Sequence, residues 1–366
     1  MQKRLFALAV AGLAGAPAFA QSSVTIFGTV DVGYRFSGDN IDSRVKNRSA
    51  IDSGTSTPTR LGFRGNEDLG NGLQAGFVLE QGIAADTGTS AGGGTFSRQA
   101  FVSLAGAFGT LGAGRQYTPG YVLTSTVDPF SGVTVGQYNN VYLSEYRWDN
   151  LVTYVSPSWG GFSVTAAFTL DGYGNESPGN RGAGDVGDVR ALSILPQYRS
   201  GPLHVGLHIQ DLRAKSTGLY DGDKVRVYDL AGTYDFGVAK LAAAYGIRRA
   251  DNGDFSPDTG ATEGEKTKQW FVGVTVPAGA AGKVLASYVA RKTEAVAGGD
   301  DAKAGQWAVG YEHALSKRTA IHATYAKIDN NRAARDSTNL SGSVGAGYNA
   351  GDGYQTGFAA GIRHGF

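Results

Sequence analysis

The sequence predicts an all-β fold, in the form of a sixteen-stranded antiparallel barrel. Three observations predict it. Apolar side chains recur at every second position in many segments, short and long connections between these segments alternate, and the chain ends on a segment with the same alternation. Seven short turns and eight long polar loops between antiparallel strands imply sixteen strands.

The chain begins with a segment that precedes this pattern. Met1–Ala20 carries Lys3 and Arg4, then an apolar run, then small residues ending in Ala18-Phe19-Ala20. This order is typical of a secretory signal peptide, with cleavage expected before Gln21. Residues 21–366 are then expected to form a single barrel domain.

Composition excludes several classes of function. The chain has 33 Lys and Arg against 32 Asp and Glu, and loss of Lys3 and Arg4 with the leader leaves 31 against 32. A near-neutral chain gives no case for nucleic-acid binding, which needs a clustered positive excess. There is no cysteine, so no disulfide and no thiolate metal site is expected. We expect neither a cofactor nor a metal.

The first predicted strand, Ser23–Phe36, shows the alternation clearly. Val24, Ile26, Val30 and others share one face, whereas the opposite face is mostly polar. The same pattern recurs in three later segments: Phe162–Asp171, Leu203–Asp211 and Lys268–Val276. The last strand, Gly353–Phe366, ends on an aromatic residue, whereas most soluble domains end in a loosely held polar tail.

Two architectures accommodate many strands that are polar on one face only. A soluble sandwich buries the apolar faces between two sheets, whereas a transmembrane barrel turns them to lipid and encloses water. Alternating short periplasmic turns and long external loops favour the barrel, as does a final strand that can pair with the first and leave no free edge. Aromatic residues near the ends of apolar faces also favour it: Tyr34, Phe36, Phe162, Trp270, Tyr288, Trp307 and Tyr311.

Four stretches carry a family resemblance: the segment "QSSVTIFGTVDVGYRF" after the cleavage site, Thr59–Gly82, Arg98–Tyr117 and the terminal Phe366. Together they resemble the trimeric general porins of beta-proteobacterial outer membranes. The resemblance implies a homotrimer in contact with outer-membrane lipids and lipopolysaccharide, passive diffusion of small hydrophilic solutes, and no enzymatic activity. It also implies that Phe366 is the signal read by the barrel assembly machinery.

The resemblance also implies a pore constriction. The long connection of residues 118–146 corresponds to a third external loop that folds into the lumen, with Asp128 and Glu145 as candidate carboxylates. Alternation aims Arg60 and Arg64 into the lumen, whereas Arg98 and Arg147 are assigned by resemblance.

The strands that flank this loop lose their alternation. Around Ala100–Gly114 both faces are small or apolar, which suits a wall covered inside by the loop and outside by another subunit. Arg115 could serve the pore wall or the subunit interface, and its parity with Leu111 favours the interface.

These observations predict a weakly anion-selective diffusion channel of the outer membrane. Three alternatives stay open: a channel specific for one anion or organic acid, a barrel enzyme, and a secreted soluble β protein used for adhesion.

Overall fold

The computed structural model of the chain describes residues 23–131, 135–172, 189–214, 223–251, 264–296, 298–336, 343–344 and 353–366. The leader predicted over Met1–Ala20 lies outside the described residues, as does most of the long loops predicted at 172–188, 251–266 and 329–352.

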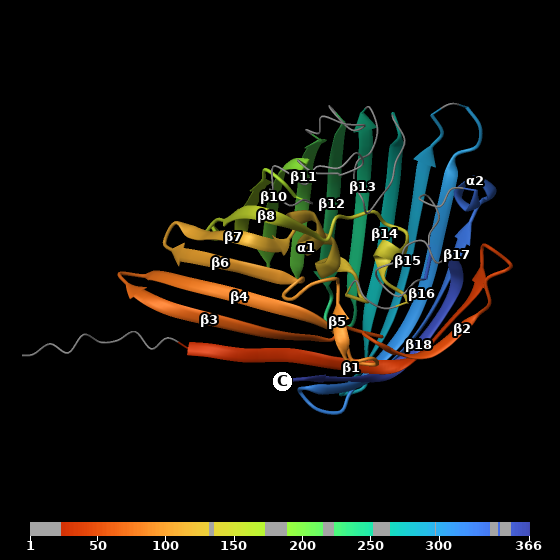
Figure 1. Cartoon of the computed structure of the whole chain (residues 1–366), viewed down its shortest axis with the longest axis horizontal. Helices are drawn as coiled ribbons and strands as arrows, with labels where there is room; N and C mark the ends of the chain where they lie inside the picture. Colours follow the sequence, from red (N-terminus) through yellow and green to blue (C-terminus); the bar gives the residue numbers. More distant parts are fainter. Residues whose placement is uncertain are drawn as a thin grey trace, which may run out of the picture.

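Strands dominate the described residues, and they wind in sequence order around a curved wall (Figure 1). The strands are β1 Ser23–Asn40, β2 Arg48–Ser53, β3 Arg60–Gly70, β4 Leu73–Ala84, β5 Thr89–Ala91, β6 Gln99–Gly106, β7 Gly109–Tyr117, β8 Arg147–Val155, β9 Phe162–Thr169, β10 Val189–Ser200, β11 Leu203–Ala214, β12 Lys224–Asp235, β13 Lys240–Asp251, β14 Lys266–Ala278, β15 Gly282–Glu294, β16 Ala302–Ala314, β17 Thr319–Asn330 and β18 Tyr354–Gly365. The helices are α1 Pro119–Val127, the 3-10 turn η1 Tyr138–Asn140 and α2 Arg332–Arg335. Within the described residues, no helix has the length and apolar character needed to cross a membrane.

These segments form sixteen barrel strands. β1 pairs with β3 along its first half and with β2 along its second, so β2 and β3 are two parts of one interrupted strand. β5 and β6 pair with successive parts of β4 in the same way. All pairings are antiparallel, and β1 also pairs with β18, which closes the barrel. The predicted fold class is confirmed, and the seven predicted short turns all join consecutive barrel strands.

The last residue completes the closure. Phe366 exchanges two backbone hydrogen bonds with Gly28 of β1, each 3.1 Å long. A Cβ on Gly28 would lie 2.4 Å from the Phe366 ring, so the ring fits only because residue 28 has no side chain.

The two faces of the wall differ as the alternation predicts. On β1, Val24, Ile26 and Val30 are exposed on the outer face, whereas Asp31 and Arg35 are buried on the inner face. Six of the predicted aromatic residues also lie exposed: Tyr34, Phe162, Trp270, Tyr288, Trp307 and Tyr311. Apolar and aromatic side chains therefore face outward, and polar groups face the interior.

The segment between β7 and β8 enters this interior. Its helix α1 contacts β9 to β13, with Thr118 as the N-cap and Pro119 in the first turn (Figure 1). The segment buries its apolar side chains against small residues of the inner wall. Among them are Leu123, Val127, Phe130 and Tyr138 of the segment and Ala231, Ala242, Ala244, Ala308 and Ala326 of the wall.

The wall covered by this segment differs from the one expected. The sequence pointed to β6 and β7 because both of their faces are small or apolar. The structure instead brings α1 mainly against β9–β13, where alanines at inward positions leave room for the loop.

Candidate functional site

A cavity of about 280 Å³ separates the loop from the opposite wall. Its wall side is formed by residues of β1, β2, β4, β5 and β8 and of the connections that precede β3 and β6, and its loop side by Tyr121, Gln137 and Tyr146. The charged lining residues are Arg35, Arg48, Arg98, Arg147, Asp52 and Asp86. Four arginines against two aspartates give the lining a positive excess. This lumen cavity is the candidate constriction.

Three of the predicted arginines belong to one connected array. Glu80 of β4 accepts from Arg98 Nε at 2.7 Å and lies 3.4 Å from Arg60 Nε. The Tyr117 hydroxyl lies 2.6 Å from Arg98 Nη2 and 2.9 Å from Arg147 Nη2, and accepts from both. We call these five residues, Arg60, Glu80, Arg98, Tyr117 and Arg147, the arginine array.

Local structure holds the array in place. The backbone N–H of Arg98 donates to Glu80 O at 3.1 Å, which aligns the two side chains. The Arg147 guanidinium lies 4.4 Å from the centre of the Tyr117 ring, a cation–π contact. Tyr117 also stacks on Tyr121 of α1 at 5.2 Å, so the array reaches the loop.

A second charged group completes the lining. Arg48 of β2 makes a bidentate contact to Asp52, with N···O distances of 2.6 and 2.5 Å. Arg35 of β1 is buried beside it, with Nε 3.5 Å from Asp52 Oδ2. Bidentate pairing fixes Arg48 in one geometry, so the guanidinium is an oriented part of the cavity wall.

Asp31 accounts for the break between β2 and β3. Its buried carboxylate accepts from the backbone N–H groups of Thr55, Ser56 and Thr57, at distances between 2.7 and 3.2 Å. The chain therefore bulges inward over residues 54–59 before β3 starts at Arg60. Gly54 and Pro58 in this bulge both line the cavity.

The other two predicted arginines lie outside the array, and like Arg60 they are not among the residues that line the cavity. Arg64 has the predicted inward parity, and its guanidinium lies 5.3 Å from the ring of Phe27, nearer the short-turn end of β3. Arg115 lies at the irregular pairing between β7 and β8, where it donates to Ser97 O and, at 2.5 Å, to Asp149 Oδ1.

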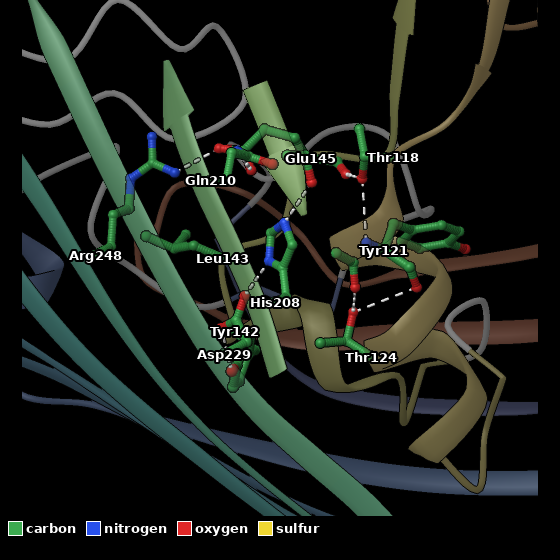
Figure 2. Close-up of polar contacts among 12 residues, drawn as sticks. Thr118, Tyr121, Thr124, Tyr142, Leu143, Glu145, His208, Gln210, Asp229 and Arg248 are labelled. Carbon is green, nitrogen blue, oxygen red and sulfur yellow. Dashed lines mark hydrogen bonds and ion pairs between the residues drawn. The ribbon is translucent and has the colours of Figure 1, made fainter. Parts of the chain in front are cut away.

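The two loop carboxylates are placed differently from the expectation that they face the arginines. Asp128 is buried at the C-terminal end of α1 and accepts from the backbone N–H groups of Phe130 and Tyr138. Glu145 is buried against the far wall, with Oε1 2.5 Å from Arg248 Nη1 and Oε2 2.9 Å from Gln210 Nε2 (Figure 2). Neither residue is among those lining the cavity.

Glu145 remains charged in this position. Burial raises the pKa of its carboxyl, but the Arg248 guanidinium and the hydrogen bonds from Arg248 and Gln210 offset burial and hold the pKa below its usual range. Glu145 therefore fastens the loop to β11 and β13.

A second polar network fastens the loop next to Glu145. Tyr142 donates to Asp229 Oδ1 at 2.6 Å, Asp229 Oδ2 lies 2.9 Å from His208 Nδ1, and His208 Nε2 lies 3.0 Å from Ser193 Oγ (Figure 2). Burial raises the pKa of Tyr142 well above its ordinary value, so the hydroxyl keeps its proton. A Cβ on Gly120 of α1 would lie 2.4 Å from the His208 ring, so the helix covers the imidazole closely.

Two glutamines fasten the rest of the loop. Gln269 of β14 accepts from Leu143 N at 2.8 Å and donates to Leu143 O at 3.0 Å. Gln306 of β16 donates to the carbonyls of Gly136 and Gln137, each at 3.0 Å. These contacts hold the loop against one side of the barrel and leave the lumen cavity on the other side.

Sequence reasoning missed Arg35, Arg48, Asp52 and Glu80. Arg35 and Glu80 carried a usable signal, because alternation along β1 and β4 places both on the inner face. Arg48 and Asp52 carried no such signal, because the sequence alone predicts an external loop for the segment that contains them.

Comparisons with known proteins agree with the barrel fold. The Gram-negative porin family matches residues 7–334. Outer membrane porin protein 32 of Delftia acidovorans is 35% identical over 376 residues, which cover 100% of both chains. Among solved structures, the anion-selective porin from Comamonas acidovorans has a TM-score of 0.76 and 31% identity, covering 94% of this chain and 100% of its own.

A more distant structure shares the fold. OmpT of Vibrio cholerae in its trimer form has a TM-score of 0.69 at 18% identity, covering 94% of this chain and 99% of its own. The match over most of the chain, together with the closed barrel and its inward-packed loop, shows that this chain belongs to the Gram-negative porin family and lies in the bacterial outer membrane.

Proposed function

We propose that the barrel is a water-filled channel for passive diffusion of small hydrophilic solutes, and that it prefers anions. The observation that carries the preference is the lining of the lumen cavity, where four arginines face two aspartates and the loop side contributes Tyr121, Gln137 and Tyr146. A lining with an excess of one sign of charge raises the local concentration of ions of the opposite sign and lowers that of ions of its own sign.

The arginines also select for polar solutes. Arg147 presents its guanidinium over Tyr117, and Arg48 is held by Asp52, so both charges are fixed rather than mobile. Fixed charges order the water in a narrow lumen, and an apolar solute cannot compensate for displacing that water. Passage should therefore favour small anions over neutral apolar molecules.

Arg147→Gln is expected to lower the anion preference, because it removes one positive charge from the cavity lining. Reversal potentials across planar bilayers with a salt gradient measure the change. Arg64→Gln is the matched control, since it removes an inward arginine that does not line the cavity. Equal effects of the two substitutions would assign the preference to the lumen as a whole.

A channel specific for one anion or organic acid is separable from a general one. A general channel should show no block of conductance by micromolar concentrations of any single organic acid. Titration of di- and tricarboxylates into a bilayer recording tests this, and a micromolar block by one of them would establish specificity.

The outer face supports a homotrimer. A groove of about 630 Å³ crosses β1, β3, β4 and β6–β8, and its outward side chains are mainly apolar or small. They include Val24, Phe77, Val102, Leu104, Leu111 and Val152. We place the neighbouring subunits on this face. Native mass measurement of the detergent-extracted protein should give three chains, and a monomer would contradict the proposal.

The two ends of the chain have roles in export and assembly in this proposal. Removal of Met1–Ala20 would leave Gln21 as the first residue, which intact-mass measurement of the membrane protein tests. Phe366 would act as the recognition signal for the barrel assembly machinery, so Phe366→Ala should reduce the amount of folded barrel in outer-membrane fractions.

No catalytic role is proposed. Ser193, His208 and Asp229 are hydrogen-bonded in the same sequence as the side chains of a hydrolytic triad. However, they are 0%, 2% and 3% exposed beneath the loop, so no substrate reaches them in this structure. Their contacts with Tyr142 and α1 account for their positions as part of the loop attachment. Absence of ester hydrolysis by the purified protein is the expected result.

A further inference from the structure

The interruption between β2 and β3 contains more chain than the pairing of the strands requires. Val32 of β1 lies opposite Ser53, and Thr29 of β1 lies opposite Arg60. Two residues of β1 therefore face six residues of the neighbouring strand, residues 54–59. We call these six residues the inner bulge.

The barrel wall closes behind the inner bulge, at Ile83 of β4. Ser53 Oγ donates to Ile83 O at 3.1 Å, and Ile83 N donates to Thr59 O at 3.0 Å. Both ends of the inner bulge thus meet the same residue of the next strand, and the chain between them leaves the wall and enters the lumen. Extra residues in one strand of a pair recur next to active sites, so we looked for a role of the inner bulge in the lumen.

One carboxylate holds the inner bulge in place. Asp31 Oδ1 accepts from Thr55 N at 2.7 Å and from Thr55 Oγ1 at 2.8 Å, and Asp31 Oδ2 accepts from Thr57 N at 3.1 Å. Ser56 N lies 3.2 Å from both carboxylate oxygens, and His322 Nε2 lies 3.5 Å from Oδ2. Successive backbone N–H groups that converge in this way form an anion-binding nest, and the anion here is a side chain of the protein itself.

The inner bulge also rests on the seam between β1 and β18. A Cβ on Gly33 of β1 would lie 2.7 Å from Thr55 Oγ1, and a Cβ on Gly361 of β18 would lie 2.8 Å from it. The two glycines therefore leave the room that Thr55 occupies. Ser56 Oγ accepts from Arg363 Nη1 of β18 at 3.3 Å. One side of the inner bulge is thus packed against the barrel wall.

The other side of the inner bulge faces the lumen cavity. Gly54, Pro58 and Thr59 line the cavity, whose loop side is formed by the segment between β7 and β8. Arg60 Nη1 donates to Pro58 O at 3.1 Å, and Arg35 Nη2 donates to Gly54 O at 3.4 Å. Carbonyl groups of the inner bulge therefore orient one arginine of the array and one arginine of the cavity lining.

We propose that the inner bulge is a second constricting element, which narrows the lumen from the side opposite the loop, and that Asp31 is the positioning residue that keeps it there. This inference rests on the diffusion channel proposed above. Inserted chain bounds the cavity on both sides, so the size limit for solutes depends on the inner bulge as well as on the loop. The nest requires an anion of the right size rather than an aspartate, so a small carboxylate from solution can replace the side chain of Asp31.

The test measures permeation of uncharged sugars, which do not respond to the charge of the lining. Swelling of liposomes that contain the purified protein gives the rates for a trisaccharide and for a pentose, and the ratio of the two rates reports the size limit. Asp31→Ala removes the carboxylate from the nest and should raise this ratio severalfold. Sodium formate, compared with a bulky sulfonate at the same ionic strength, should lower the ratio again, because formate supplies the two oxygens that the nest has lost.

Deletion of Thr55–Pro58 tests the proposal even if Asp31→Ala does not fold. It leaves Gly54 and Thr59 opposite two residues of β1, and removal of an even number of residues keeps the alternation of the strand. The ratio should rise at least as far as in Asp31→Ala, and formate should have no effect when the deletion and Asp31→Ala are combined. Asp149→Asn is the control, since it removes a wall carboxylate outside the cavity lining, and it should leave the ratio unchanged.

Three results, obtained with variants that migrate as folded protein on semi-native gels, would overturn the proposal. An unchanged ratio after the deletion would show that the inner bulge does not limit the passage. A raised ratio in Asp31→Ala that formate does not lower would show that the carboxylate does not act through the nest. An equal rise in Asp149→Asn would assign the change to a general loosening of the barrel. Absence of pentose permeation through the unmodified protein would contradict the diffusion channel itself, whereas the three results above would leave the channel in place.

Discussion

Arg98→Gln is expected to reduce the anion preference of the channel several-fold and to destabilise the barrel. Arg98 is buried, and it is the closer of the two arginines that contact Glu80. Its loss lowers the positive charge of the cavity lining and leaves the buried Glu80 with Arg60, 3.4 Å away, as its remaining ion-pair partner among the described residues. An uncompensated buried charge costs about 3–5 kcal/mol, and because Arg60 still pairs with Glu80 we expect a smaller loss here.

The size of the selectivity change depends on how closely ions pass the lining. One unit charge within about 4 Å changes the energy of an ion by about 1 kcal/mol even at the dielectric constant of water, which is about fivefold in occupancy. Reversal potentials should therefore show a permeability ratio several-fold closer to unity. The temperature at which the folded form is lost on semi-native gels should also fall.

The double variant Arg98→Gln/Glu80→Gln separates the two effects. It removes both charges, so most of the stability should return, whereas anion preference should stay below that of the unmodified protein. An unchanged reversal potential in the single variant would remove Arg98 from the set of residues that determine selectivity.

Glu145→Gln is expected to loosen the attachment of the loop at residues 118–146. The substitution keeps the shape of the side chain, but it leaves the Arg248 guanidinium buried without the carboxylate that lies 2.5 Å from it. Removing one partner of a buried ion pair is destabilising, by up to about 3–5 kcal/mol. Gln269 and Gln306 still hold the loop, so we expect increased fluctuations of single-channel current and a lower unfolding temperature, rather than loss of the barrel.

Acidic pH should have a related effect on the unmodified protein. The folded-state pKa of Glu145 is depressed, so its stabilising contribution is present above the ordinary pKa of a glutamate and is lost as the pH falls through the lowered value. Current fluctuations should rise only in that acidic range, and the Glu145→Gln variant should lack this contribution to the rise.

Asp128→Asn provides the comparison within the same loop. A carboxylate that faced the arginines across the lumen would repel anions, so its removal would strengthen the anion preference. Because Asp128 instead accepts from the backbone N–H groups of Phe130 and Tyr138, we expect an unchanged reversal potential. A stronger anion preference in the variant would show that the Asp128 carboxylate does act on ions at the constriction.

The barrel could be predicted from sequence because its determinants are local. Alternation along segments such as Ser23–Phe36 directly reports which side chains face lipid, and the turn residues between segments report strand number. The interruption between β2 and β3 was not predictable in this way. It depends on Asp31 reaching the backbone of residues 55–57, a contact between positions on different barrel strands.

The candidate site was predictable only in part. Alternation placed Arg60 on the inner face, and the structure joins it to Arg98 and Arg147 through Glu80 and Tyr117. The orientation of the loop was beyond sequence reasoning, because it depends on contacts as distant along the chain as Gln269 with Leu143. Such contacts fix which carboxylates are used to anchor the loop and which groups remain in the lumen.

The pairing of Phe366 with Gly28 has a consequence for biosynthesis. β1 pairs with β18 from Asn40 opposite Tyr354 to Thr29 opposite Gly365, and the bonds of Phe366 extend this seam, so a polypeptide that stops before β18 would keep both margins of its sheet unpaired. Such fragments cannot become stable in a bilayer, where unpaired backbone groups are costly. The geometry of the seam therefore makes stable membrane insertion depend on the synthesis of β18.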